Sequence, residues 1–63
     1  MTLDEIKAAV SAGQTVCWQN RSYVVELAPV GYVIRCLSNE NAIGLTWRDG
    51  VTLNGREDEF FIA

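Results

Sequence analysis

The sequence predicts an α+β domain in which a short N-terminal helix packs on a small, strongly curved antiparallel sheet or SH3-like half-barrel of about five strands. Two observations predict this class. A helix-start signal precedes apolar residues at helical spacing, and from residue 14 onward short runs with period-two alternation lie between turn residues. At 63 residues the chain forms one domain. A chain of this length buries only about 60% of the surface that its unfolded form exposes, so the core must be small.

The first predicted element is a helix over residues 3–12. Thr2 followed three residues later by Glu5 is a capping-box signature, because the hydroxyl and the carboxylate accept hydrogen bonds from free amides of the first turn. Gly13 stands where a left-handed C-terminal cap is expected. So short a helix is marginal alone, and its apolar stripe must therefore dock on the sheet. That stripe comprises Leu3, Ile6 and Val10.

Residues 15–19 and 22–27 predict a hairpin with a tight turn at 20–21. Alternation puts Val16 and Trp18 on one face of the first strand. On the second strand the shared face consists of Tyr23, Val25 and Leu27.

Further strands are expected at 32–37, at 42–47 and, as the last strand, at 59–62. A very short strand at 51–53 lies between two turn dipeptides. Gly44 marks a bulge or a close backbone approach. Alternation along 42–47 directs three side chains inward: Ile43, Leu45 and Trp47.

Composition excludes several kinds of chemistry. The chain has no histidine, so a Cys–His or Ser–His catalytic pair is excluded, and its two cysteines lack the spacing of a zinc or redox site. We expect no catalytic residue, no metal and no cofactor. Cys17 and Cys36 are interpreted as reduced, buried small hydrophobes of a cytoplasmic protein, and no apolar run approaches the ~20 residues that span a bilayer.

The net charge of −3 favours a basic partner over a polyanion. Nucleic-acid binding requires Lys and Arg side chains that neutralise phosphates. One Lys and four scattered Arg provide little positive charge for this purpose. Small barrels do stack bases on exposed aromatic rings beside Arg, so this function stays an alternative. We favour the interpretation that these aromatic side chains form the core; they are Trp18, Tyr23, Tyr32 and Trp47.

The segment 54–61, NGREDEFF, places three acids directly before two phenylalanines. One interpretation is a solvated charge run that protects an edge strand from pairing with other chains. The other is a negative face that attracts a basic protein surface. In a strand, Phe60 and Phe61 point to opposite faces, so Phe61 is a candidate exposed anchor. The candidate partner-binding carboxylates are Glu57, Asp58 and Glu59, joined by Asp49 and Glu40.

The runs IGLTWRDGVTLNGREDEFF (43–61) and TLDEIKAAVSAGQTVCWQNRSYVV (2–25) resemble very small proteins of phages and other mobile elements of Gram-negative bacteria, among which are anti-CRISPR inhibitors. The resemblance implies a non-enzymatic, monomeric inhibitor in the bacterial cytoplasm. It further implies that the protein blocks DNA or PAM recognition by a type I CRISPR surveillance complex through an acidic surface that binds a Cas subunit. The alternatives are an SH3-like adaptor that binds a protein through exposed aromatics and a small nucleic-acid-binding barrel.

Overall fold

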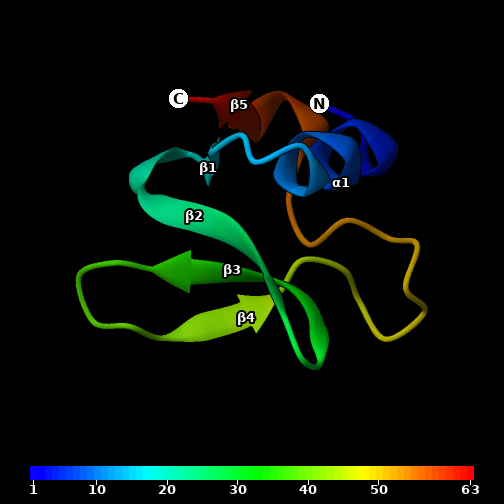
Figure 1. Ribbon diagram of the computed structural model, residues 1–63. Helices are drawn as coiled ribbons and strands as arrows, with labels where there is room; N and C mark the ends of the chain where they lie inside the picture. Colours follow the sequence, from blue (N-terminus) through cyan, green and yellow to red (C-terminus); the bar gives the residue numbers. More distant parts are fainter.

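The computed structural model describes residues 1–63 and has the predicted α+β architecture: one short helix packed on a five-stranded antiparallel sheet (Figure 1). The strands lie in the order β4-β3-β2-β1-β5, and the sheet is open, so β4 and β5 are its two edges. The elements are α1 (Leu3–Ser11), β1 (Val16–Trp18), β2 (Asn20–Ala28), β3 (Gly31–Cys36), β4 (Ala42–Gly44), the 3₁₀ helix η1 (Glu57–Glu59) and β5 (Phe60–Ile62).

Helix α1 begins and ends close to the predicted residues. The Thr2 side chain accepts a hydrogen bond from the Glu5 amide at 3.2 Å, and the Glu5 carboxylate accepts one from the Thr2 amide at 2.8 Å, which completes the capping box. The helix ends at Ser11, and Gly13 follows with a φ of +86°, the left-handed conformation that glycine adopts at little cost. Ile6 and Ala9 are buried against the sheet.

Strand β2 is the longest strand and pairs with β1 on one side and β3 on the other. Val25 lies opposite Ile34, and both are buried. Leu27 lies on the same face as Tyr23 and Val25, as alternation predicts, but its side chain is 63% exposed. The reason is position: Leu27 lies near the β2–β3 turn, where the hairpin projects beyond the core (Figure 1).

Strand β5 completes the sheet by pairing with β1, so the two ends of the chain share one side of the molecule. Phe60 lies opposite Trp18, and their rings stack with centroids 6.2 Å apart. Phe60 is buried whereas Phe61 is 36% exposed, as strand alternation predicts. The buried cluster contains residues of the helix, of β1, β2, β3 and β5, and of the segment that follows β4. Its members are Ile6, Ala9, Val16, Val25, Ile34, Leu45 and Phe60.

The region after β4 differs most from the prediction. Strand β4 ends at Gly44, and Leu45 keeps one backbone hydrogen bond to Tyr32 of β3 while its side chain turns into the core. Residues 46–47 leave the sheet. Ile43 lies opposite buried Ile34 and so shares the inward face, as predicted, although at the edge of the sheet it is 45% exposed. Trp47 is 65% exposed, contrary to the predicted inward direction. The predicted strand at 51–53 is absent, because Leu53 makes only an isolated bridge to Thr46.

The two cysteines are free, and the register explains why. Cys17 lies opposite Val24, and Cys36 lies opposite Tyr23. Val24 and Tyr23 are adjacent on β2, so the thiols lie on opposite faces of the sheet and two strands apart, which prevents a disulfide. Cys17 is buried as predicted, but Cys36 is only half-buried.

Candidate protein-binding surfaces

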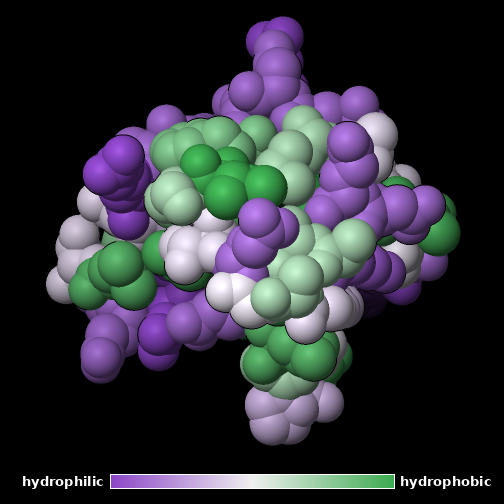
Figure 2. All heavy atoms as spheres, turned by 45° about the horizontal axis from the view of Figure 1, so that its top comes forward, coloured by the Kyte–Doolittle hydropathy of each residue, from purple (hydrophilic) through white to green (hydrophobic).

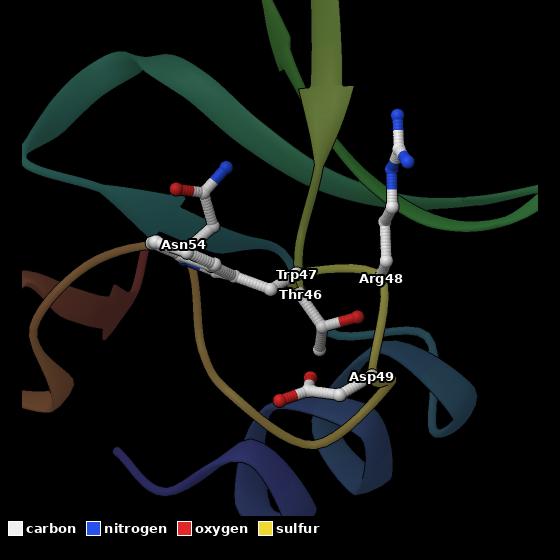
Figure 3. A pocket seen from close by; sticks show the side chains of 5 residues that line it. All are labelled: Thr46, Trp47, Arg48, Asp49 and Asn54. Atoms are coloured by element: carbon white, nitrogen blue, oxygen red, sulfur yellow. The ribbon is translucent and has the colours of Figure 1, made fainter.

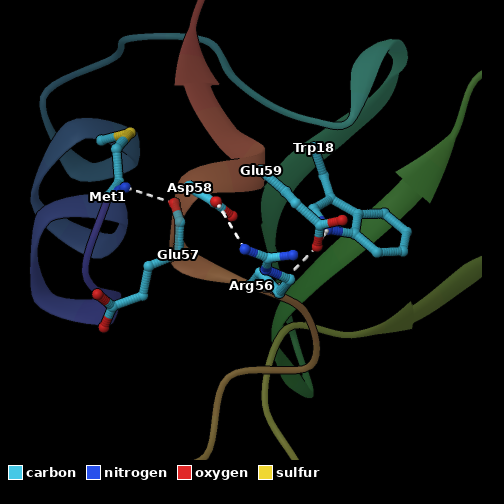
Figure 4. A network of polar contacts seen from close by, with 6 residues as sticks. All are labelled: Met1, Trp18, Arg56, Glu57, Asp58 and Glu59. Atoms are coloured by element: carbon cyan, nitrogen blue, oxygen red, sulfur yellow. Dashed lines mark hydrogen bonds and ion pairs between the residues drawn. The ribbon is translucent and has the colours of Figure 1, made fainter.

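The acidic segment begins with η1 and not with the strand that the sequence predicts from residue 59. Glu59 folds back at the end of η1, where its carboxylate accepts hydrogen bonds from the Arg56 amide at 2.8 Å and the Trp18 indole Nε1 at 3.3 Å (Figure 4). These donors lower the pKa of Glu59, with the Arg56 amide as the main cause. Glu59 therefore has a structural role in holding η1 against β1.

The other two acids of this segment remain at the surface. Asp58 pairs with the Arg56 guanidinium at 3.0 Å, and both side chains are largely exposed, so the pair contributes little to stability. The backbone carbonyl of Glu57 accepts a hydrogen bond from the amino group of Met1 (Figure 4). This bond brings η1 beside the N-terminal end of α1. We call that region the acidic end; it comprises Asp4, Glu5, Glu57 and Asp58.

Asp49 and Glu40 lie away from the acidic end. Asp49 closes a turn of its own, because its carboxylate accepts hydrogen bonds from the Val51 amide at 3.0 Å, the Thr52 amide at 2.9 Å and the Thr52 hydroxyl. The Thr52 hydroxyl is the main cause of its lowered pKa. Glu40 belongs to the β3–β4 loop. Figure 1 shows that this loop, the loop after β4 and η1 occupy three separate parts of the molecule. The structure therefore does not bring the five predicted carboxylates onto one face.

Exposed apolar side chains form a second candidate surface, which the alternation argument missed. In Figure 2 apolar atoms form several patches separated by polar ones, and one apolar projection lies where the β2–β3 turn is found in Figure 1. Val30 of this turn is 90% exposed. The turn borders a hollow of about 600 Å³ that we call the Trp47 groove. Its walls include Lys7, Val30, Tyr32, Ile43, Gly44 and Trp47.

Trp47 also borders a second hollow, of about 440 Å³, so it lines two depressions of the surface. Figure 3 shows the second of them. The second hollow is formed by the loop after β4, and Arg48 extends away from Asp49 there (Figure 3). Its lining residues are Thr46, Trp47, Arg48, Asp49 and Asn54.

The lining of the Trp47 groove contains one charged side chain, Lys7, and its charge is positive. Lys7 places its Nζ 5.6 Å from the centroid of the Tyr32 ring, close enough for a cation–π contact. Neither Lys7 nor Arg48 forms an ion pair, whereas Arg35 and Arg56 pair with Glu26 and Asp58. The molecule thus has an acidic end at α1 and η1, and an apolar groove with unpaired cations near β4.

Groups suited to reaction chemistry are few. No three His, Cys, Asp or Glu side chains gather in a way that could hold a metal ion. Hydrogen bonding, mainly from the Ser38 amide, lowers the pKa of the Cys36 thiol, yet no general base lies beside it in a molecule without histidine. Helix α1 lacks the length and apolar character needed to cross a bilayer.

No protein-family model, curated protein sequence or solved structure matches this chain. The surfaces just described are therefore the basis on which a function can be inferred. The prediction that Trp47 belongs to the core requires residues 42–47 to form one strand, and the strand ends at Gly44. A signal for the correct assignment was present: Gly44 followed by the turn dipeptide at 49–50 favours an early end to the strand.

Proposed function

We propose that this chain is a non-catalytic protein-binding domain of the bacterial cytoplasm, and that it binds its partner through the Trp47 groove. The observation that carries the proposal is the position of Trp47, which is 65% exposed and borders two adjacent hollows. Tryptophan is among the residues that most often dominate the energy of a protein interface, where a partner packs around it and excludes water.

The free energy that burial of Trp47 would release supports a binding role. A fully buried tryptophan removes roughly 200 Å² of surface from water, and each Å² contributes about 25 cal/mol of stabilising free energy. Burial of the exposed part of Trp47 would therefore contribute about 3 kcal/mol that the free protein does not gain. Val30 adds to this unrealised burial because it is 90% exposed on the neighbouring turn. A partner that covers both side chains recovers this free energy on binding.

The test is affinity capture from a bacterial lysate with the intact chain as bait, compared with Trp47→Ala and Val51→Ala. Both residues are exposed, so both variants should keep the fold and a urea midpoint close to that of the parent chain. We expect Trp47→Ala to lose the captured protein and Val51→Ala, which does not line the groove, to keep it. Equal capture by both variants would reject the Trp47 groove as the binding surface.

A second candidate, an inhibitor that binds a basic protein surface, is favoured by the acidic end. The Met1–Glu57 contact places carboxylates from two segments of the chain at one end of a molecule whose net charge is −3. In the type I anti-CRISPR hypothesis these carboxylates would stand in for phosphates on a Cas subunit. The pairing of Asp58 with Arg56 reduces the local negative charge, which makes this the weaker candidate.

The two candidates respond differently to salt. Binding through the acidic end should weaken steeply as salt rises and should be lost in the double variant Glu57→Lys, Asp58→Lys. Glu59 is kept in this variant because it holds η1 in place. Glu40→Lys, in the separate β3–β4 loop, makes a matched control. Binding that changes neither with salt nor in the double variant would reject the acidic end as the binding surface.

A further inference from the structure

The outer edge of β4 has free backbone hydrogen-bonding groups. Two bonds fix the register with β3: the Leu45 amide donates to the Tyr32 carbonyl at 3.0 Å, and the Cys36 amide donates to the Asn41 carbonyl at 2.8 Å. In an antiparallel ladder this leaves Ile43 paired with Ile34 and turns the backbone groups of Ala42 and Gly44 away from β3. No further segment lies beyond β4 in Figure 1.

Three of these four outward groups are free. The Gly44 carbonyl accepts a hydrogen bond from the Asn54 side-chain amide at 3.1 Å. The Ala42 amide, the Ala42 carbonyl and the Gly44 amide have no protein partner. All three residues of β4 are exposed, so the edge is accessible along its length.

The two edges of the sheet differ in how well they are protected from pairing with another chain. At β5 the Phe60 amide already donates to the Glu57 carbonyl, and three acids directly precede the strand, a charge pattern that discourages pairing with other chains. The β4 edge lacks such a run; Glu40 lies near its start, and the unpaired cations Lys7 and Arg48 lie near its end. The apolar side chains of the Trp47 groove flank the same edge.

We propose that β4 accepts an extended segment of a partner protein as a sixth strand of the sheet. The backbone of that segment pairs with Ala42 and Gly44, its apolar side chains cover Val30 and Trp47, and a carboxylate near one end faces Lys7 and Arg48. This inference rests on the proposed protein-binding function and states the form of the partner. Strand addition of this kind takes affinity from main-chain hydrogen bonds and specificity from alternate side chains.

The test uses a phage-displayed library of random twelve-residue peptides, selected on the intact chain. Two variants separate backbone pairing from side-chain contact. Ala42→Pro removes the outward amide, which β3 does not use, and Ala42→Val retains it. We expect selected peptides to alternate apolar and polar residues, to include an Asp or Glu, and to bind Ala42→Val normally. Ala42→Pro should bind at least about tenfold more weakly, since the peptide loses a backbone hydrogen bond.

Hydrogen exchange supplies a readout that does not depend on the variants. A bound peptide should slow exchange of the Ala42 and Gly44 amides, and the same peptide with its alternate amides N-methylated should not. The inference is overturned if no peptide is enriched, if Ala42→Pro and Ala42→Val bind equally, or if protection appears at β5 instead. A captured protein whose binding needs Trp47 but does not protect Ala42 would overturn strand addition alone and leave the proposed function in place.

Discussion

The Glu59 carboxylate accepts a hydrogen bond from the Trp18 indole at 3.3 Å, across 41 positions of sequence. This bond connects η1 to β1, and the stacked rings of Trp18 and Phe60 lie beside it. The same carboxylate caps the Arg56 amide. An acid that the sequence offers as a partner contact is thus part of the structure that fixes β5 on the sheet.

Replacing Glu59 should therefore destabilise the fold more than replacing its neighbours. Glu59→Ala removes the acceptor of two hydrogen bonds, whereas the Glu57 side chain accepts none within the protein. We expect a lower urea midpoint and altered tryptophan fluorescence for Glu59→Ala, and parent-like values for Glu57→Ala. Equal midpoints for the two variants would show that the Trp18 contact contributes nothing measurable.

Acid should destabilise the domain. Hydrogen bonds lower the pKa values of Glu5, Asp49 and Glu59 below those of the unfolded chain, which lie at about 3.9 for Asp and 4.3 for Glu. Each carboxylate thus stabilises the fold fully above its unfolded pKa, and that stabilisation is lost as pH falls through the lowered folded value.

The measurement is the urea midpoint as a function of pH. It should be level from about pH 7 to 5 and should fall below about pH 4. Asp49→Asn keeps the size of the side chain but removes its titration, so the acid-induced fall should be shallower in this variant. A midpoint that rises on acidification would contradict the hydrogen-bonding pattern found around these carboxylates.

The two thiols should differ in reactivity. Cys36 is half-buried, and donors led by the Ser38 amide lower its pKa, so a larger fraction is thiolate at neutral pH. We expect iodoacetamide to alkylate Cys36 in the folded protein, with a half-maximal pH below the value of about 8.5 for a free cysteine. Cys17 is buried and should react only after unfolding in urea. Mass spectrometry of the Cys36→Ser variant checks this, since label on its folded form would contradict the burial of Cys17.

Gly55 should not tolerate a side chain. A Cβ at this position would lie 2.7 Å from the Trp18 Nε1, and the φ of +157° adds backbone strain for other residues. Gly55→Ala should cost about 1–3 kcal/mol of unfolding free energy, because the indole must move off the Glu59 carboxylate. Gly50→Ala is the control: its φ is +74° but its Cβ would meet nothing, so tryptophan fluorescence should stay unchanged. An unchanged indole environment in Gly55→Ala would contradict the predicted displacement.

The elements specified by local chemistry could be predicted from the sequence. The capping box at Thr2 and Glu5 defines the start of α1, and Gly13 defines its end, because both act on the nearest backbone groups. Alternation correctly gives the sheet face on which Val25 and Ile34 lie, since both strands are fully paired there. Fold class follows from these same features.

Contacts between distant segments could not be predicted in this way. Alternation predicts the face on which a side chain lies only while the chain remains in a sheet. Strand β4 ends at Gly44, so alternation does not apply to Trp47, whose side chain turns outward. The role of Glu59 depends on an indole 41 positions away, which no local pattern reports. The acidic segment could be identified as distinctive, but which of its carboxylates are free depends on the tertiary fold.

The strand order has a consequence for how this chain folds as it leaves the ribosome. The meander of β2, β3 and β4 joins strands that are neighbours along the chain, so it can assemble early. Strand β1 is made first among the strands, yet its outer side stays unsatisfied until β5 arrives. During that interval the backbone of residues 16–18 and the apolar side chain of Val16 are open to misassociation, and a chaperone that recognises short apolar β segments would find its binding site there.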